Sequence, residues 1–251
     1  RNLTRKRLLL NSRDETINFV HLLFKFVKQI MKYFHQNHIS ELPSRQKANL
    51  INTISGYKSA NLIATRSENG VSNLAIFNSV VHLGSNPALL GFILRPLTVE
   101  RHTYANIKMN ATYTINAVSE EIYAAAHATA AKYPKDISEF EKTGLTASYK
   151  AGFSAPFVKE SPIQIGCSYV NEYEIKENGC LLIVGAIEHI YVQESILLED
   201  HWGKLYEANL ISIVGLDGYA KPKIIQRLSD AQPDKTSKSI LNGTQKGKSS
   251  H

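Results

Sequence analysis

Two neighbouring stretches decide the fold: Ile163-Gln-Ile-Gly-Cys-Ser-Tyr-Val-Asn-Glu-Tyr173 and Leu181-Leu-Ile-Val-Gly-Ala-Ile-Glu-His-Ile-Tyr-Val192. Both are rich in β-branched and aromatic residues, which favour strands. The two stretches therefore predict two long strands.

The same pattern extends outward from this pair. From Ala48 onward, short β-rich runs are bounded by Gly, Asn, Ser and Pro. These runs predict five further strands: 59–65, 72–76, 89–94, 112–118 and 211–214. Because strands outnumber helices and no regular crossover helices separate them, the pattern predicts a mainly β protein, an antiparallel barrel with a few helices.

Two helices are expected between the strands. The first covers Tyr104 to Met109, with Thr103 as its N-cap. The second is an alanine-rich helix that begins after Ser119 and runs to about Lys132.

The chain of 251 residues, 43% of them apolar, is long enough for one domain with extensions. Residues 1–30 are interpreted as an extension outside the native domain, because they are rich in Lys and Arg and the composition changes at Met31 to that of a compact domain. The alternative is an amphipathic helix that packs on the body or on a membrane surface. Residues 230–251 have almost no apolar side chains and are predicted to be a disordered basic tail.

The formal charge of +7 belongs to the two ends of the chain. Residues 1–30 and residues 221–251 each carry +5, whereas residues 31–220 carry −3. Short basic ends on a slightly acidic body favour solvated extensions over a phosphate-backbone surface. We therefore expect no nucleic-acid partner.

Cysteines and apolar segments narrow the class of protein further. Cys167 and Cys180 lack clustered His or Cys partners and are expected to be core thiols, so no metal site is predicted.

The apolar stretch Phe19 to Ile30 is interrupted by a histidine and two lysines, which argues against a spanning helix or a signal sequence. No membrane partner and a cytoplasmic location are the default expectations.

The common catalytic motifs are missing from this sequence. It has no GxSxG elbow, no HExxH, no P-loop and no GxGxxG after a strand. If the protein is an enzyme, a cofactor is expected to supply the chemistry.

Polar residues are densest in four segments: Gly70–Val80, Ser85–Pro87, Arg95–Pro96 and Glu100–Ile107. A phosphate needs hydrogen-bond donors and cations around it. These segments supply both, as Asn, Ser, His, Thr and Arg residues at a strand end, in a loop and at a helix N-terminus. These residues predict a small-molecule phosphate site. Alternatively, the same residues only form turns and caps.

Four segments carry a resemblance to a known family: Asn73-Leu-Ala-Ile-Phe-Asn-Ser79, the Asn86-Pro87 turn, Arg101-His-Thr-Tyr-Ala-Asn-Ile107 and Gly215-Leu-Asp-Gly-Tyr219. Together they resemble the flavin reductase-like family, of the flavoredoxin kind. The resemblance covers roughly residues 45–228. It implies an FMN-binding split β-barrel, an antiparallel Greek-key fold, occupying residues 31–229.

The resemblance also implies a set of FMN-binding residues. Asn73, Ala75 and Phe77 would lie near the isoalloxazine ring, and Asn78 and Ser79 near the ribityl and phosphate groups. The phosphate would face Arg101, His102 and Thr103. The remaining candidates are Val80, Arg95 as a weaker phosphate ligand, and Tyr219 as a residue that stacks on the flavin.

Two departures from the family pattern bear on FMN affinity. The chain has Ile76 and Asn78 where members often show Pro and Ser around the Phe, and Pro87 is followed by Ala88 rather than by a second proline.

The activity implied by the resemblance is reduction of flavin by NADH or NADPH, with no catalytic side chain. Implied partners are nucleotide cofactors, a second copy in a homodimer, and an electron-acceptor protein. The alternative is an FMN-binding electron carrier that does not oxidise NAD(P)H efficiently itself. Which nucleotide is preferred stays open.

Overall fold

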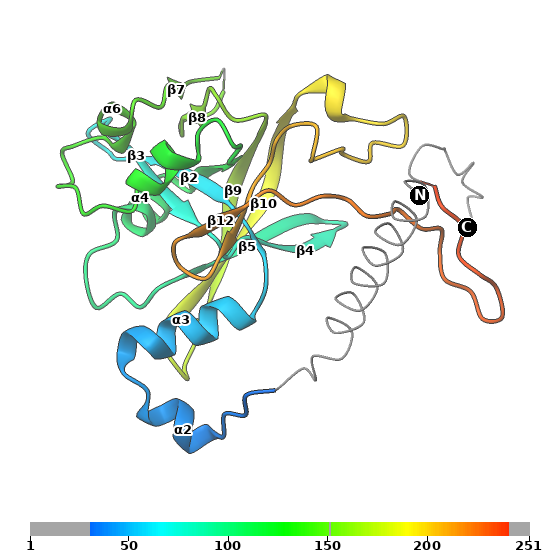
Figure 1. Ribbon diagram of the computed structural model, residues 1–251. Helices are drawn as coiled ribbons and strands as arrows, with labels where there is room; N and C mark the ends of the chain where they lie inside the picture. Colours follow the sequence, from blue (N-terminus) through cyan, green and yellow to red (C-terminus); the bar gives the residue numbers. More distant parts are fainter. Residues whose placement is uncertain (1–30, 151, 241–251) are drawn as a thin grey trace, which may run out of the picture. The chain divides into compact units, whose positions relative to one another are not determined.

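The computed structural model describes residues 31–150 and 152–240 (Figure 1). The chain divides into two compact units between Lys47 and Ala48. The described part of the first unit contains α2 (Gln36–Glu41) and the start of α3 (Ser44–Ile54). The predictions for residues 1–30 and for 241–251 fall outside the described residues.

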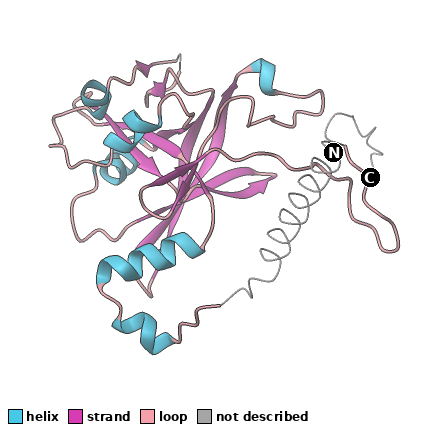
Figure 2. Cartoon of the chain, in the orientation of Figure 1, coloured by secondary structure: helices cyan, strands magenta, loops and turns pink. Residues whose placement is uncertain are grey.

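The second unit is built on one antiparallel sheet of seven strands (Figure 2). All neighbouring pairs are antiparallel. The mainly β, antiparallel prediction is therefore confirmed. In spatial order the strands are β3 (Ser72–Phe77), β2 (Asn61–Arg66), β6 (Thr112–Ala117), β9 (Ile163–Ile175), β10 (Cys180–Val192), β5 (Ala88–Leu94) and β4 (Val81–Ser85).

Two small sheets and four short helices complete this unit. The sheets are β1 (Lys58–Ser59) with β11 (Ser212–Val214) and β12 (Gly218–Ala220), and β7 (Ala147–Ser148) with β8 (Phe157–Val158). The helices are α4 (His102–Asn110), α5 (Tyr123–Ala128), α6 (Glu139–Thr143) and the 3₁₀ helix η1 (Glu194–Ile196).

The two stretches that decide the fold form β9 and β10, which pair from Ile163↔Val192 to Ile175↔Cys180. The ladder has irregularities next to Val184 and next to Ile187, where the register shifts. Such bulges bend and twist long strands. They help a pair of 13-residue strands curve around the core.

The core consists of two clusters, one on each face of β2. Leu62 and Ala64 pack into the first cluster, whereas Ile63 packs into the second with Phe92 and Tyr113. This division follows from the alternation of side chains along a strand. Cys167 is a buried core thiol, as expected, while Cys180 is only partly buried; both are free.

Several element boundaries differ from the sequence predictions. The run 59–65 is divided between β1 and β2, and β4, which contains His82, is not among the predicted strands. Gly84 lies at a register irregularity in β4, and such a short, interrupted run lacks a clear strand pattern. The alanine-rich helix is shorter than expected and ends at Ala128, where Thr129 bonds back to the carbonyl oxygen of Ala126 at 2.7 Å.

The described part of the predicted tail contains local pairing. Isolated bridges join Leu228 to Ser239 and Gln232 to Lys235. In residues 31–150 and 152–240, no helix is long and apolar enough to cross a membrane, and no group of His, Cys, Asp or Glu has the arrangement of a metal site.

Candidate functional site

A cleft of about 600 Å³ lies where the polar segments of the sequence meet. Its walls come from β3, the end of β5, the N-terminus of α4, the residues that follow α5, the start of α6, and the β11–β12 hairpin. The lining residues are Asn73, Ala75–Ser79, Ile93–Arg95, Val99–Thr103, His127, Thr129–Tyr133, Glu139, Ile213, Leu216 and Tyr219.

One wall of the cleft is the free edge of the main sheet. β3 is an edge strand, so alternate backbone groups along it have no strand partner. The N–H of Leu74 faces this edge and donates to the carboxylate Oε2 of Glu139 at 2.9 Å. Because strand groups repeat every two residues, the N–H and C=O of Ile76 face the same edge, toward the cleft.

The N-terminus of α4 forms a second wall and is not capped by a side chain. Arg101, rather than the predicted Thr103, is the N-cap residue, and its side chain makes no capping hydrogen bond. The first turn of a helix has N–H groups without intrahelical partners and carries partial positive charge. The buried Nε of Arg101 also has no hydrogen-bond partner among the described residues. These donors suit an anion.

Thr103 lies within the first turn of α4, where it links the helix to β3. Its hydroxyl oxygen accepts a hydrogen bond from the side-chain amide of Asn73 at 3.0 Å, and both residues are buried. The sequence prediction of Thr103 as the N-cap is therefore wrong by two positions. The Thr103 hydroxyl is hydrogen-bonded to Asn73 and does not cap the helix. The helix instead begins at His102, with Arg101 as an N-cap residue whose side chain makes no capping bond.

Ser79 and Asn78 join the cleft to neighbouring strands. The hydroxyl of Ser79 donates to the carbonyl oxygen of Ile93 at 3.0 Å and accepts from its N–H at 3.2 Å. Asn78 donates to the carbonyl oxygen of Gly215 at 3.4 Å. Arg95, two residues beyond Ile93, is exposed at the end of β5. These residues border the cleft and also hold its walls together.

Phe77 gives the cleft part of its apolar surface. Its ring packs edge-on against Phe92, with centroids 5.2 Å apart. Ala75, two residues earlier on the same face of β3, also lines the cleft. Val80 is not among the lining residues; it packs against the core cluster that contains Phe92.

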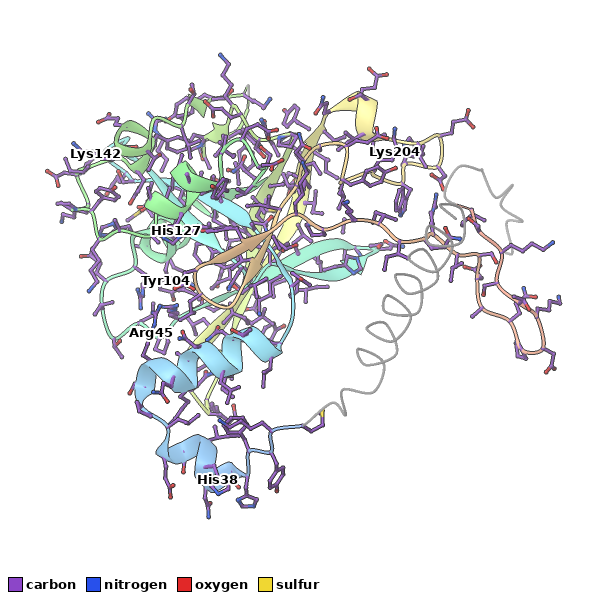
Figure 3. All side chains as sticks on the ribbon, viewed as in Figure 1. His38, Arg45, Tyr104, His127, Lys142 and Lys204 are labelled. Atoms are coloured by element: carbon purple, nitrogen blue, oxygen red, sulfur yellow. The ribbon has the colours of Figure 1, made fainter. Side chains whose placement is uncertain are left out.

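Tyr219 lies in the cleft and bonds to a histidine. Its hydroxyl is 2.8 Å from Nδ1 of His127, and its ring contacts that of Tyr123 at 5.4 Å. Burial raises the pKa of the Tyr219 phenol. Figure 3 labels His127 among the side chains around the short helices. A lone histidine in an alanine-rich helix gives no sequence signal for this site.

The structure thus brings ten of the eleven predicted site residues to one cleft and leaves out Val80. It adds residues that sequence reasoning missed, chiefly Glu139 and the segment 129–133. No local signal in the sequence connects Glu139 to β3, because their contact spans 65 residues of chain.

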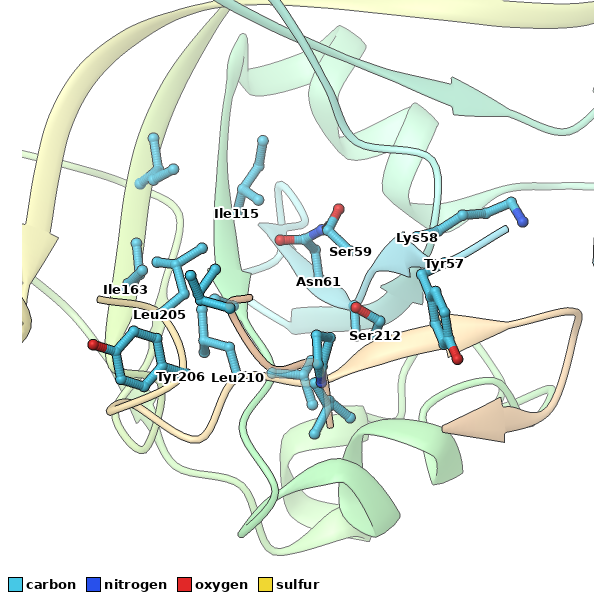
Figure 4. A pocket seen from close by; sticks show the side chains of 17 residues that line it. Tyr57, Lys58, Ser59, Asn61, Ile115, Ile163, Leu205, Tyr206, Leu210 and Ser212 are labelled. Atoms are coloured by element: carbon cyan, nitrogen blue, oxygen red, sulfur yellow. Dashed lines mark hydrogen bonds between the residues drawn. The ribbon is translucent and has the colours of Figure 1, made fainter. Parts of the chain in front are cut away.

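A second, mainly apolar cavity of about 430 Å³ shares no lining residue with the cleft. Figure 4 shows Ile115, Ile163, Leu205 and Leu210 among its walls, with Asn61 and Ser212 as polar groups. The cation in its lining, Lys58, already donates to the carbonyl oxygens of Asn52 and Gly56, so the cavity offers a phosphate less than the cleft does.

The edge strand of an antiparallel sheet, an uncapped helix end and the buried Nε of Arg101 thus place hydrogen-bond donors around one cleft. Residues 55–208 match the flavin reductase like domain, so the chain belongs to the flavin reductase-like family. A solved split barrel domain from Shewanella frigidimarina, a candidate flavin reductase, is 43% identical, covers 80% of this chain and all of its own, and superposes with a TM-score of 0.77.

Two further comparisons are with a protein of the same fold and with a sequence relative. The flavoredoxin of Desulfovibrio vulgaris shares the fold, with a TM-score of 0.60 and 20% identity over 71% of this chain and 92% of its own. An uncharacterized protein of Aquifex aeolicus is 28% identical over 143 residues, 55% of this chain and 70% of that protein. The expected split-barrel fold and family are therefore confirmed.

Proposed function

We propose that this protein binds FMN in the cleft and acts as an oxidoreductase in which the flavin is reduced by NADH or NADPH. The observation that carries the proposal is the buried Nε of Arg101 at the uncapped N-terminus of α4, which has no hydrogen-bond partner in the part of the chain that the structure describes. A buried guanidinium N–H without an acceptor is costly unless a ligand supplies one. The phosphate of FMN has the charge and the oxygen acceptors for this position.

The remaining lining residues suit the other parts of FMN. Ala75 and Phe77 present a small and a flat apolar surface along β3, against which the isoalloxazine ring is expected to lie. The open backbone edge at Ile76 offers a donor and an acceptor to the polar side of such a ring. Asn78 and Ser79 would lie beside the ribityl hydroxyl groups, and Asn73 and Tyr219 beside the ring.

Bound flavin would supply the redox chemistry by accepting hydride from the nicotinamide. The protein's own contribution is to hold the flavin phosphate at Arg101 and to keep the ring against β3. No side chain is needed as a nucleophile or general base for this task, which agrees with the absence of catalytic motifs from the sequence.

The proposal is tested by the visible absorption spectrum of the purified protein after soaking with FMN and desalting. Retained flavin bands that bleach on anaerobic addition of NADH or NADPH are expected. Retained bands that bleach only with a reduced partner protein would favour an electron carrier instead. A protein that loses all flavin on desalting, and shows no NAD(P)H oxidation with added FMN, would contradict the proposal.

We further propose that the chain forms a homodimer through the surface around the apolar cavity. Tyr57, Leu205 and Ile224 line this cavity and are exposed, and the adjacent Ile225 is 95% exposed. Clustered exposed apolar side chains commonly mark an interaction surface. A second copy of the chain would remove them from water.

A further inference from the structure

Glu139 is a carboxyl group buried within the cleft. It is the first residue of α6, follows the N-cap Ser138, and is 6% exposed. One carboxylate oxygen accepts the Leu74 N–H, so the side chain is directed at the wall of the cleft that β3 forms. A buried carboxylate in a binding cleft affects every charge that a ligand brings there.

The carboxyl group lies at the same end of β3 as the N-terminus of α4. Leu74, which donates to Glu139, directly follows Asn73, which donates to Thr103 in the first turn of α4. Burial has the largest effect on this carboxyl and raises the pKa of Glu139 above its usual range. The hydrogen bond from the Leu74 N–H and the electrostatic effect of the nearby His102 lower this pKa by less.

The ionisable groups near Glu139 come from several elements. The start of α4 contributes Arg101 and His102, and the residues in and after α5 contribute His127, Lys132 and Tyr133. Tyr219 comes from β12, while β3 contributes no ionisable side chain. On α6 itself, Glu141 and Lys142 are exposed to water.

We propose that Glu139 is a specificity-determining residue of the cleft: its carboxylate opposes a phosphate at the N-terminus of α4 and so limits the preference for FMN over riboflavin. Uptake of a proton by this carboxyl removes the repulsion and strengthens the preference. The inference rests on the proposed function, because it requires a flavin in the cleft. Riboflavin carries no phosphate, so its binding is insensitive to this charge.

The test compares the dissociation constants of FMN and riboflavin, measured by quenching of flavin fluorescence from about pH 5 to about pH 8. The variant is Glu139→Gln, which keeps an oxygen acceptor for the Leu74 N–H and removes only the charge. Glu141→Gln is the matched control, since Glu141 lies two residues away on the same helix and is exposed.

At about pH 8, Glu139→Gln is expected to tighten FMN binding about tenfold relative to the wild type and to change riboflavin binding less than about twofold. The difference between the two proteins should shrink as the pH falls, because the raised pKa of Glu139 favours the protonated carboxyl in the wild type. Other titrating groups, including the FMN phosphate, affect FMN binding by both proteins in the same way. The ratio of the FMN dissociation constants of the variant and the wild type therefore reports the charge of Glu139 alone. Glu141→Gln should match the wild type throughout.

Equal changes for FMN and riboflavin would overturn the inference and assign Glu139 a structural role. A ratio between variant and wild type that does not change with pH would also overturn it. Failure of the wild type to bind either flavin is a different result, which contradicts the proposed function itself.

Discussion

Arg101 has two features that a bound anion would explain. It is the N-cap residue of α4 yet does not cap the helix, and its buried Nε lacks a partner among the described residues. Each feature costs stability when no ligand is bound. Both are accounted for if the residue is held ready for an anion.

Arg101→Ala should therefore weaken FMN binding by more than tenfold, since charge-assisted hydrogen bonds are worth roughly 1.5 to 3 kcal/mol. Riboflavin binding should change far less, because it has no phosphate. Isothermal titration calorimetry with both flavins measures the difference, and Lys142→Ala, an exposed cation on α6, serves as the control. An unchanged FMN affinity would show that the phosphate site is misplaced.

Glu139 also predicts how stability depends on pH in the ligand-free protein. Burial raises its folded-state pKa, so the folded protein favours the protonated carboxyl. Its contribution to stability is complete below the pKa of an unfolded glutamate and is lost as pH rises through the raised folded value.

The melting temperature of Glu139→Gln should consequently exceed that of the wild type by a margin that grows from about pH 4.5 to about pH 7. Thermal unfolding followed by circular dichroism gives this margin at each pH. A margin that shrinks with rising pH would mean that the carboxylate is net stabilising, through its bond to the Leu74 N–H.

Among the elements, the side chain of Tyr113 on β6 reaches across β9 to β10, where Gly185 leaves room for it. A Cβ on Gly185 would clash with the hydroxyl oxygen of Tyr113, a fully buried residue of the core. Gly185 also adjoins the first register shift between β9 and β10. The absence of a side chain at this position lets the Tyr113 ring fill the space.

Gly185→Ala is expected to destabilise the protein by about 3 kcal/mol, the upper range for overpacking a core. Adding Tyr113→Phe should restore part of the loss, because it removes the closest atom. Chemical denaturation measures both, with Gly203→Ala as a control whose nearest contact is the flexible end of Leu205. Full stability of the single variant would contradict the packing described.

The sequence predicted the elements whose residues carry a strong local pattern. The apolar and β-branched runs that became β9 and β10 were located almost to the residue. β4 was missed, since Gly84 and His82 interrupt a run of five residues. The start of α4 was misplaced because Thr103, a good N-cap by type, is engaged by Asn73 on another element.

The site was predictable to the extent that its residues lie in a few continuous segments. Asn73 to Ser79 and Arg101 to Thr103 were found together because polar residues are dense there. Glu139 and His127 reach the cleft only through tertiary contacts with Leu74 and Tyr219, which leave no trace in local sequence. Long-range packing decides such positions.

For the whole molecule, assembly is the main prediction. Ile225→Glu, on the surface proposed to meet a second copy, should shift the protein from dimer toward monomer, because it places a charge among clustered apolar side chains. Light scattering coupled to size-exclusion chromatography measures the mass. Met109→Glu, at another exposed apolar position, should leave the mass unchanged. A wild type that is monomeric at all concentrations would contradict the proposal.

The central claim is that one cleft binds FMN with its phosphate at the start of α4. A crystal structure of the protein soaked with FMN tests it most directly. We predict flavin density in the cleft, with phosphate oxygens within hydrogen-bonding distance of Arg101 Nε and the first-turn N–H groups of α4, and the ring along β3. Flavin bound in the apolar cavity, or with its phosphate directed away from Arg101, would contradict the account.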